Sequence, residues 1–161
     1  MARLDLSLTA EELEAFVTAH RTVRVATADR RGRPHVVPLW YVWLEGAMFM
    51  NSTLGNVTVR RLEANPRVAA LVDDGEMYDE LRGVLLHGGV ARADGDPRLS
   101  TVAELWSRKY LDGDPVPFDR WRGRVWLRLD PERVTSWDFR KIPEARARAR
   151  AAEAPGGIAR G

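Results

Sequence analysis

The sequence predicts a mostly β (α+β) domain, in which antiparallel strands form a closed or partly closed barrel with short helices beside it. About six or seven short strand-like segments follow one another, and about three helical segments lie between them. One of the strands is apolar on both faces. Short antiparallel strands leave unpaired edges unless the sheet closes, so this succession favours a barrel over an open sheet.

Length and composition indicate one globular domain. The chain has 161 residues, of which 45% are hydrophobic and 30% charged. No apolar run approaches the roughly 20 residues that a membrane helix needs. The N-terminus lacks the apolar core of a secretory signal, and the absence of cysteine excludes disulfides, thiolate metal sites and cysteine nucleophiles. We therefore expect a cytoplasmic protein that does not bind membranes.

The C-terminal segment differs in composition from the rest of the chain. Residues 143–161 are rich in alanine and arginine and have no apolar stripe, so we expect a domain over 1–142 and then a disordered or marginally helical tail. This tail carries the whole formal excess of +2. A nucleic-acid-binding protein would have its basic excess on the folded domain, so we expect no nucleic-acid partner.

The elements follow from local patterns. Thr9 and Glu12 form a capping-box pattern, which predicts a helix that ends near His20. Turn residues and apolar periodicity place the remaining boundaries. The further predicted elements are a strand over 22–28, a turn over 29–34, a strand over 35–43, a strand over 47–51, a helix over 57–64, a strand over 67–72, a strand over 81–93 with a bulge at Gly88 and Gly89, a helix that begins at 96–97, and strands over 124–129 and 133–139.

The strand over 35–43 cannot have one face in water, because both of its faces are apolar. Its even positions are Val36, Pro38, Trp40 and Val42, and its odd positions are Val37, Leu39, Tyr41 and Trp43. We expect one face to fill the barrel interior. The other face then needs a cover, which is either a ligand or a second subunit.

Hydroxyl side chains precede the helix predicted over 57–64. Ser52 and Thr53 lie in the segment that leads into this helix, and the first turn of a helix has unpaired backbone N–H groups that attract anions. Arg60 and Arg61 add guanidinium groups, which bind phosphate through paired hydrogen bonds. The pattern predicts an anion site; the alternative is a capped surface helix with solvated arginines.

The tryptophans, the histidines and the absent motifs carry the remaining indications of function. Trp40 and its aromatic neighbours suit a flat ring such as an isoalloxazine, although most of the six tryptophans are expected in the core or in a dimer interface. His20, His35 and His87 have no carboxylate at metal-ligand spacing, so no metal site is predicted. The sequence has no glycine-rich phosphate loop and no nucleophile elbow, and nothing in it indicates hydrolysis.

Several segments, taken in their order and spacing, resemble the pyridoxamine-phosphate-oxidase-like split-barrel superfamily. Within it, the chain is most similar to the actinobacterial reductases that depend on coenzyme F420, a deazaflavin. The resemblance covers roughly residues 10–142. The matching segments are Val-Ala-Thr at 25–27, Gly-Arg-Pro-His-Val-Val-Pro-Leu-Trp-Tyr at 32–41, Val-Arg-Arg-Leu at 59–62, Asn-Pro-Arg-Val at 65–68, Asp-Gly at 74–75, Tyr-Asp-Glu-Leu-Arg-Gly-Val at 78–84, and Ser-Trp-Asp-Phe-Arg-Lys at 136–141.

This resemblance implies a six-stranded antiparallel split β-barrel of the FMN-binding type, which forms a homodimer with cofactor sites between the subunits. It places residues 37–40 along the cofactor ring, the turn at 51–53 and the following helix at the phosphate, and residues 78–82 on the partner chain. Arg60 or Arg61 would face the phosphate or the acidic tail of the deazaflavin. The cofactor-binding residues implied are Val37, Pro38, Leu39, Trp40, Asn51, Ser52, Thr53, Thr58, Arg60, Arg61, Tyr78 and Arg82.

One position departs from the family pattern. Members commonly carry Lys-x-x-Asn-Leu in the helix after the phosphate turn, whereas Thr58 and Arg61 occupy the lysine and asparagine positions here. Lysine and arginine bind phosphate differently, so they are not interchangeable. Either Arg60 and Arg61 take over the role, or the cofactor preference has shifted, or the site is weakened.

Three functions are consistent with the sequence. The first is a coenzyme F420-dependent oxidoreductase that transfers hydride to an electron-poor small organic substrate, with the proton supplied by solvent, by the substrate itself, or by a side chain such as Tyr41 or Tyr78. The second is an FMN-binding oxidase or flavin reductase. The third is a non-catalytic cofactor- or haem-binding protein, in which His35 or His87 would serve haem. No catalytic residue is assigned.

Overall fold

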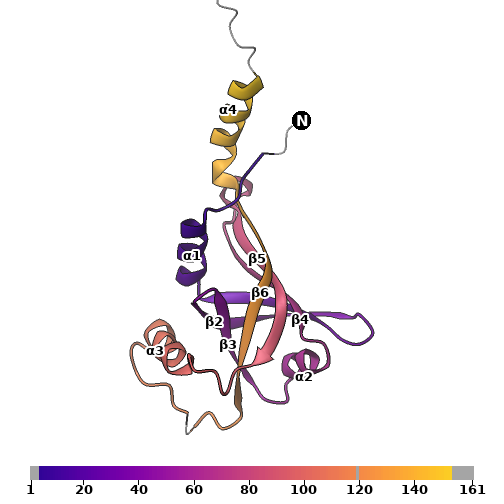
Figure 1. The fold of residues 1–161 in the computed structure, drawn as a ribbon, viewed down its shortest axis with the longest axis vertical. Helices are drawn as coiled ribbons and strands as arrows, with labels where there is room; N and C mark the ends of the chain where they lie inside the picture. The colour runs from indigo at the N-terminus through magenta and orange to yellow at the C-terminus, as the bar shows by residue number, and fades with distance from the viewer. Residues whose placement is uncertain (1–3, 119, 154–161) are drawn as a thin grey trace, which may run out of the picture.

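In the computed structural model, which describes residues 4–118 and 120–153, six antiparallel strands form a closed barrel with helices around it (Figure 1). Neighbouring strands follow the order β1-β2-β3-β6-β5-β4. The elements are α1 (Ala10–Ala19), β1 (Thr22–Ala28), β2 (Pro34–Leu44), β3 (Ala47–Thr53), α2 (Val57–Ala64), β4 (Arg67–Asp74), η1 (Tyr78–Glu80), β5 (Arg82–Arg92), α3 (Leu99–Tyr110), β6 (Arg124–Asp138), η2 (Phe139–Lys141) and α4 (Ile142–Glu153). The predicted fold class is confirmed.

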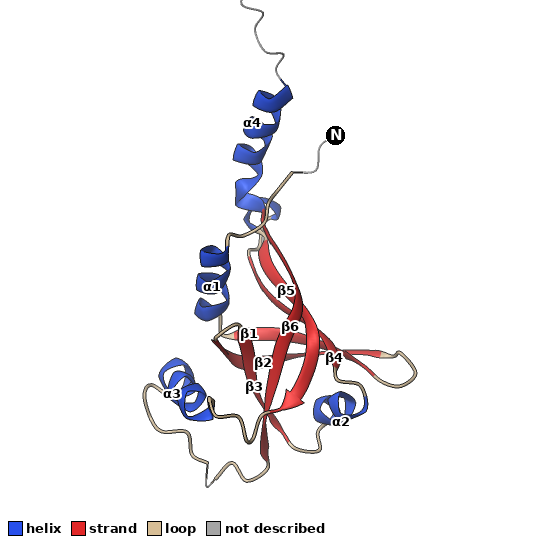
Figure 2. Ribbon diagram, in the orientation of Figure 1, coloured by secondary structure: helices blue, strands red, loops and turns tan. Residues whose placement is uncertain are grey.

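Two cores hold these elements together. The barrel interior collects inward side chains from every strand, with Phe16 and Val17 from α1 and Val59 and Leu62 from α2. These two helices lie on opposite sides of the barrel (Figure 2). A second core forms where α3 covers the outer faces of β2, β3 and β6, and its buried residues include Trp106 of α3. Burial of these apolar faces stabilises helices that are otherwise short.

The last strand is longer than the sequence analysis expected. β6 runs without interruption through the residues that were predicted to separate two strands. Gly88 pairs with Pro131 and His87 with Arg133, so Glu132 is the extra residue of a bulge, at the predicted glycines. Pro131 has no backbone N–H to donate to the neighbouring strand. Because the bulge accommodates this proline, the strand continues.

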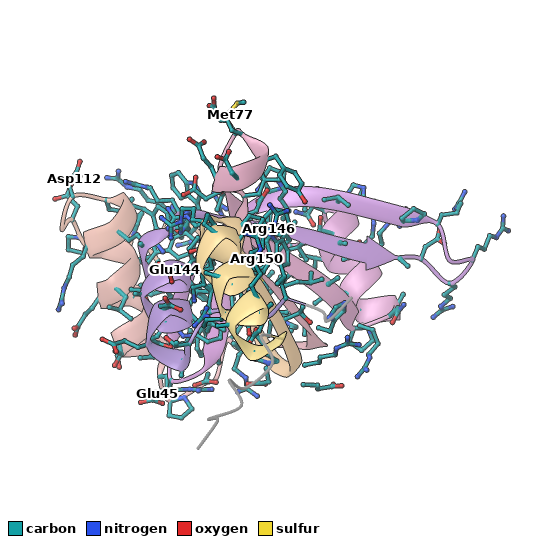
Figure 3. All side chains as sticks on the ribbon, turned by 90° about the horizontal axis from the view of Figure 1, so that it is seen from above. Glu45, Met77, Asp112, Glu144, Arg146 and Arg150 are labelled. Atoms are coloured by element: carbon teal, nitrogen blue, oxygen red, sulfur yellow. The ribbon has the colours of Figure 1, made fainter. Side chains whose placement is uncertain are left out.

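The described part of the C-terminal segment takes the helical of the two forms that were expected for the tail. Residues 142–153 form helix α4, which extends away from the barrel (Figures 1 and 3). Alanine and arginine are both strong helix formers, so this segment can be helical without an apolar stripe. Among residues 142–152, whose burial is described, Ala145 alone is buried. The remainder of the predicted tail, 154–161, lies outside the described residues.

Within the described parts of the chain, none of the helices combines the length and the hydropathy needed to cross a bilayer.

Gly88 tests the packing of the bulge. A Cβ at this position would overlap the backbone carbonyl of Asp130, so Gly88→Ala should lower the free energy of unfolding by about 1–3 kcal/mol. Gly95→Ala is the matched control, because a Cβ there meets no atom within 4 Å, and it should change stability by less than about 0.5 kcal/mol. Urea denaturation followed by tryptophan fluorescence measures both, and equal stabilities would contradict the structure.

Candidate functional site

The barrel is split where β2 changes its partner. Residues 34–40 of β2 pair with β1, and only residues 41–44 pair with β3. The last residues of β3, Asn51, Ser52 and Thr53, pair only with β6. The first half of β2 and the end of β3 therefore have facing edges that are not hydrogen-bonded to each other. The predicted ring residues 37–40 and the predicted phosphate turn 51–53 lie on the two sides of this opening.

The outer face of β2 is exposed on one side of the split. Val36 and Trp40 are 58% and 46% exposed, whereas Val42 on the same face is covered by α3. Inward-facing Tyr41 and Trp43 are buried in the barrel. One face of this strand thus fills the interior, as predicted, and the other presents an apolar surface to the surroundings.

Tyr110 of α3 holds Trp40 in place. The two rings stack with their centroids 4.4 Å apart and their planes at 8°. The Tyr110 hydroxyl accepts a hydrogen bond from the Tyr41 backbone N–H at 3.0 Å and lies 2.7 Å from the Arg21 carbonyl oxygen, to which it can donate. Burial raises the pKa of Tyr110 to about 12, so the hydroxyl keeps its proton at neutral pH. Trp40 is therefore a preformed aromatic wall.

Asn51 is a buried polar residue without a partner. Its side chain is on the β3 face that α3 covers, opposite Trp126, and is 5% exposed. Neither its amide nitrogen nor its amide oxygen makes a hydrogen bond. The indole nitrogen of Trp106 is also unpaired, and the ring centroids of Trp106 and Trp126 are 5.1 Å apart. An unpaired buried polar group costs about 1–3 kcal/mol, so such groups need an explanation. A ligand that offers a donor and an acceptor side by side would satisfy the Asn51 amide.

The start of α2 is only partly available to an anion. Asn56 caps the helix, because its side-chain oxygen accepts the Val59 N–H at 2.8 Å, and its amide nitrogen donates to Ser52 Oγ at 2.9 Å. Ser52 and Thr58 are buried, whereas Thr53 is exposed. Thr58, at the position of the family lysine, therefore offers neither charge nor reach. The helix contributes positive charge only through Arg60 and Arg61.

An arginine groove lies between α2 and the β1–β2 turn. It has a volume of about 550 Å³. It is lined by Asp29, Arg30, Arg31, Arg33, Val57, Arg60, Arg61 and Ala64. The Arg61 guanidinium donates to the Arg33 carbonyl oxygen at 2.6 Å, which ties the helix to the turn. Five arginines face one aspartate here, so the groove suits a ligand with several negative charges.

Sequence reasoning missed the three arginines of the turn as part of the site. Arg30, Arg31 and Arg33 were interpreted as a polar hairpin turn. Their cluster in the sequence was the available signal, but its proximity to α2 depends on how the barrel closes.

Tyr78 and Arg82 do not join these residues within one chain. Tyr78 is 71% exposed and its ring lies 5.1 Å from that of Phe139. Arg82 donates to Asp74 at 2.6 Å, and its guanidinium lies over the ring of Phe16 on α1. Both residues are beside α1 and the end of β6, away from the arginine groove. Their predicted approach from a partner chain stays a prediction.

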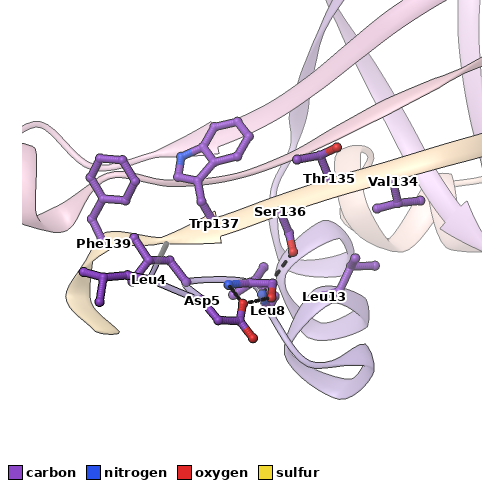
Figure 4. A pocket seen from close by; sticks show the side chains of 11 residues that line it. Leu4, Asp5, Leu8, Leu13, Val134, Thr135, Ser136, Trp137 and Phe139 are labelled. Atoms are coloured by element: carbon purple, nitrogen blue, oxygen red, sulfur yellow. Dashed lines mark hydrogen bonds between the residues drawn. The ribbon is translucent and has the colours of Figure 1, made fainter. Parts of the chain in front are cut away.

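A second hollow lies beside Phe139, whose ring is next to that of Tyr78. The N-terminal segment runs along β6, where the Asp138 N–H donates to the Leu6 carbonyl at 2.8 Å. The hollow between them has a volume of about 760 Å³, and Trp137 and Phe139 form part of its wall (Figure 4). It is mixed in polarity and holds no cluster of unpaired charges.

Comparison with known proteins identifies this architecture. A model of the pyridoxamine 5'-phosphate oxidase family matches residues 9–138. The chain belongs to this family. The split in the barrel, with residues 37–40 and 51–53 on its two sides, is therefore a split within a pyridoxamine 5'-phosphate oxidase fold, as the resemblance implied.

Solved structures of the pyridoxamine 5'-phosphate oxidase fold are similar over most of the chain. The conserved hypothetical protein Rv2991 from Mycobacterium tuberculosis has 29% identity and a TM-score of 0.76, with 89% of this chain and 92% of that chain covered. A protein described as an F420 reductase has 25% identity and a TM-score of 0.58, with 76% and 94% covered. An FAD-binding protein from Mesorhizobium loti, at 24% identity and a TM-score of 0.64 with 81% and 94% covered, supports the fold alone. A comparison with curated protein sequences gave no match.

Asn51 provides a test of the site that needs no ligand. Asn51→Leu removes an unpaired buried amide and keeps a similar volume, so the free energy of unfolding should stay the same or rise by about 1–2 kcal/mol. Ser52→Ala is the control, because it removes the acceptor for the Asn56 amide and should destabilise by about 0.5–1.5 kcal/mol. Chemical denaturation measures both variants, and a large loss of stability in Asn51→Leu would refute the assignment of an unpaired buried amide.

Proposed function

We propose that the protein is a coenzyme F420-dependent oxidoreductase, which transfers hydride from the reduced deazaflavin to an electron-poor small organic substrate. The observation that carries this proposal is the arginine groove at the Pro34 end of β2. One phosphate needs one or two arginines, whereas five arginines suit a ligand that continues into a chain of carboxylates. The acidic tail of the deazaflavin has that chemistry, and the similarity to an F420 reductase adds support.

The residues at the split fit a flavin-like ring. The exposed outer face of β2 offers apolar contact through Val36 and Pro38, and Trp40 forms a wall held by Tyr110. The unpaired amide of Asn51 complements an imide edge, which flavin and deazaflavin share, because both present adjacent N–H and C=O groups. The phosphate and tail would bind to Arg60 and Arg61, with the arginines of the turn.

The protein's part in the reaction is orientation and exclusion of water. The reduced deazaflavin, when bound, supplies a hydride from its ring carbon. Trp40 and Tyr110 present a rigid surface to one side of the split, which lowers the entropy lost on reaching a reactive arrangement. The second core beneath α3 keeps water from that side.

One of the candidate proton donors lies away from the split. Tyr41 was one candidate, but its side chain is inside the barrel, fully buried, and its hydroxyl donates to the Val17 carbonyl at 2.5 Å. Burial raises the pKa of Tyr41 well above its usual range. Tyr41 therefore cannot reach a substrate in the split. The remaining candidate proton sources are Tyr78, which is exposed, the substrate itself and solvent.

We further propose that a second copy of the chain covers the exposed face of the barrel. The register places Val36 beside Ala26 of β1, Ala26 beside Ala69 of β4, and Leu71 of β4 beside Leu85 of β5 on one outer surface. Large exposed apolar patches mark interaction sites. A homodimer through this face would bring the split of one copy towards Tyr78 and Arg82 of the other.

Fluorescence titration with coenzyme F420, and separately with FMN, tests the function. We expect saturable micromolar binding of the deazaflavin and a loss of at least about 100-fold in affinity for Arg60→Ala/Arg61→Ala, because two arginines are removed and each charge-assisted hydrogen bond contributes about 1.5–3 kcal/mol. The control, Arg67→Ala/Arg92→Ala, removes the same charge from exposed ion pairs outside the groove and should bind normally. Asn51→Leu should weaken binding of either ring.

Other results would favour an FMN enzyme or a haem-binding protein, the two functions that remain. Preference for FMN, with no effect of the double variant, would contradict the proposal and favour an FMN enzyme. A Soret band on addition of haem, lost in a His35 or His87 variant, would favour a haem-binding protein.

The homodimer has its own test. Val36→Asp places a charge on the apolar face, at a residue that is 58% exposed, and should convert dimers to monomers in analytical ultracentrifugation. Phe118→Asp is the control, because Phe118 is 55% exposed on a loop outside this face and should leave the dimer intact. A parent protein that sediments as a monomer at micromolar concentration would refute the homodimer.

A further inference from the structure

A small apolar pocket lies beside the aromatic wall. It is bounded by the end of α1, by β2 and by α3, and its volume is about 240 Å³. Its walls are Thr18, Val42, Trp43, Leu105, Arg108 and Lys109. None of these residues belongs to the arginine groove or to the split.

Lys109 is the chemically unusual member of this pocket. Its ammonium group donates to the Thr18 carbonyl oxygen at 3.0 Å and lies 4.5 Å above the ring of Tyr41 and 5.8 Å from that of Tyr110. The side chain is partly buried, and no carboxylate among the described residues forms an ion pair with it. It is therefore an amine held at one position in apolar surroundings.

Two arginines lie next to Lys109. On α1, the Glu14 carboxylate accepts a hydrogen bond at 2.7 Å from the indole N–H of Trp43, a wall of the same pocket. Arg21 precedes β1 and stacks on the other ring, Tyr110, and Arg108 is the next residue on α3. The one nearby acid on α3, Glu104, is paired with Arg108 at 3.4 Å. Burial, with a smaller contribution from Arg21, lowers the pKa of Lys109 to about 8. The Thr18 carbonyl and the two rings favour the ammonium form but do not supply a counter-charge.

The only other lysine of the chain differs from Lys109 in its contacts. Lys141 contacts the Glu12 carboxylate at 2.5 Å and the Ser7 carbonyl at 2.9 Å. The Lys141 amine is therefore held in an ion pair, whereas the Lys109 amine, among the described residues, is not. The chain therefore contains its own control for the reactivity of an amine.

We infer that Lys109 is a nucleophilic amine, which captures small hydrophobic aldehydes in this pocket as an imine. The amine nitrogen forms a bond to the carbonyl carbon, the nitrogen loses its protons to solvent, and the carbonyl oxygen leaves as water. No oxidant or reductant is needed. A lysine whose pKa is near 8 is roughly one-tenth neutral at pH 7, whereas an ordinary lysine is neutral in less than roughly one molecule per thousand.

This inference is independent of the proposed function, because it uses neither the groove nor the cofactor. It does connect the pocket to the site, since Lys109 lies against Tyr110 and Tyr110 stacks on Trp40.

Reductive trapping tests the inference. The folded protein is incubated at pH 7.5 with butanal and cyanoborohydride, and peptide mass mapping separates the two lysines from the N-terminal amine. We expect Lys109 to be alkylated at least about tenfold faster than Lys141, with a rate that rises to half its maximum near pH 8. Lys109→Arg keeps the cation between the rings and should lose the pocket adduct, while Lys141→Arg should leave it unchanged.

Two further measurements complete the test. In urea the two lysines should react equally, because the difference comes from the fold. Equal labelling of both lysines in the folded protein, or faster labelling of Lys141, would overturn the inference.

Discussion

The Tyr110 hydroxyl lies where β2 leaves β1 and begins to pair with β3. At this point the ladder between β1 and β2 ends, and the backbone N–H of Tyr41 and the carbonyl of Arg21 need other partners. Tyr110 supplies them and at the same time stacks its ring on Trp40. The contact thus ends one ladder without leaving buried polar groups unpaired, and it positions α3, which covers the second core.

The change of partner has a functional consequence. A strand that exchanges one neighbour for another leaves part of its edge unpaired, and here the open part extends from Pro34 to Trp40. Apolar side chains line its outer face, and the arginine groove lies at its Pro34 end. A ligand with an apolar ring and an anionic extension matches that order, because each part meets its complement along one strand.

Much of the fold could be predicted from the sequence. The capping box at Thr9, the helix over 57–64 and the glycines that mark the bulge at Gly88 are local features of the sequence, and these predictions are confirmed. The gap predicted near Pro131 was wrong, because a bulge opposite Gly88 lets β6 continue. The unpaired state of Asn51 could not be predicted, since it depends on which groups α3 brings against it.

By itself, the sequence determined the succession of strands, the two apolar faces of β2, and the arginines of α2, because alternation and capping are local properties. Tertiary structure alone decided that the turn arginines face α2, that Tyr41 points into the barrel, and that Tyr78 and Arg82 lie away from the groove. It also decided that Lys109 has no carboxylate while Lys141 has one. These are contacts between residues far apart in the chain, and barrel closure sets them.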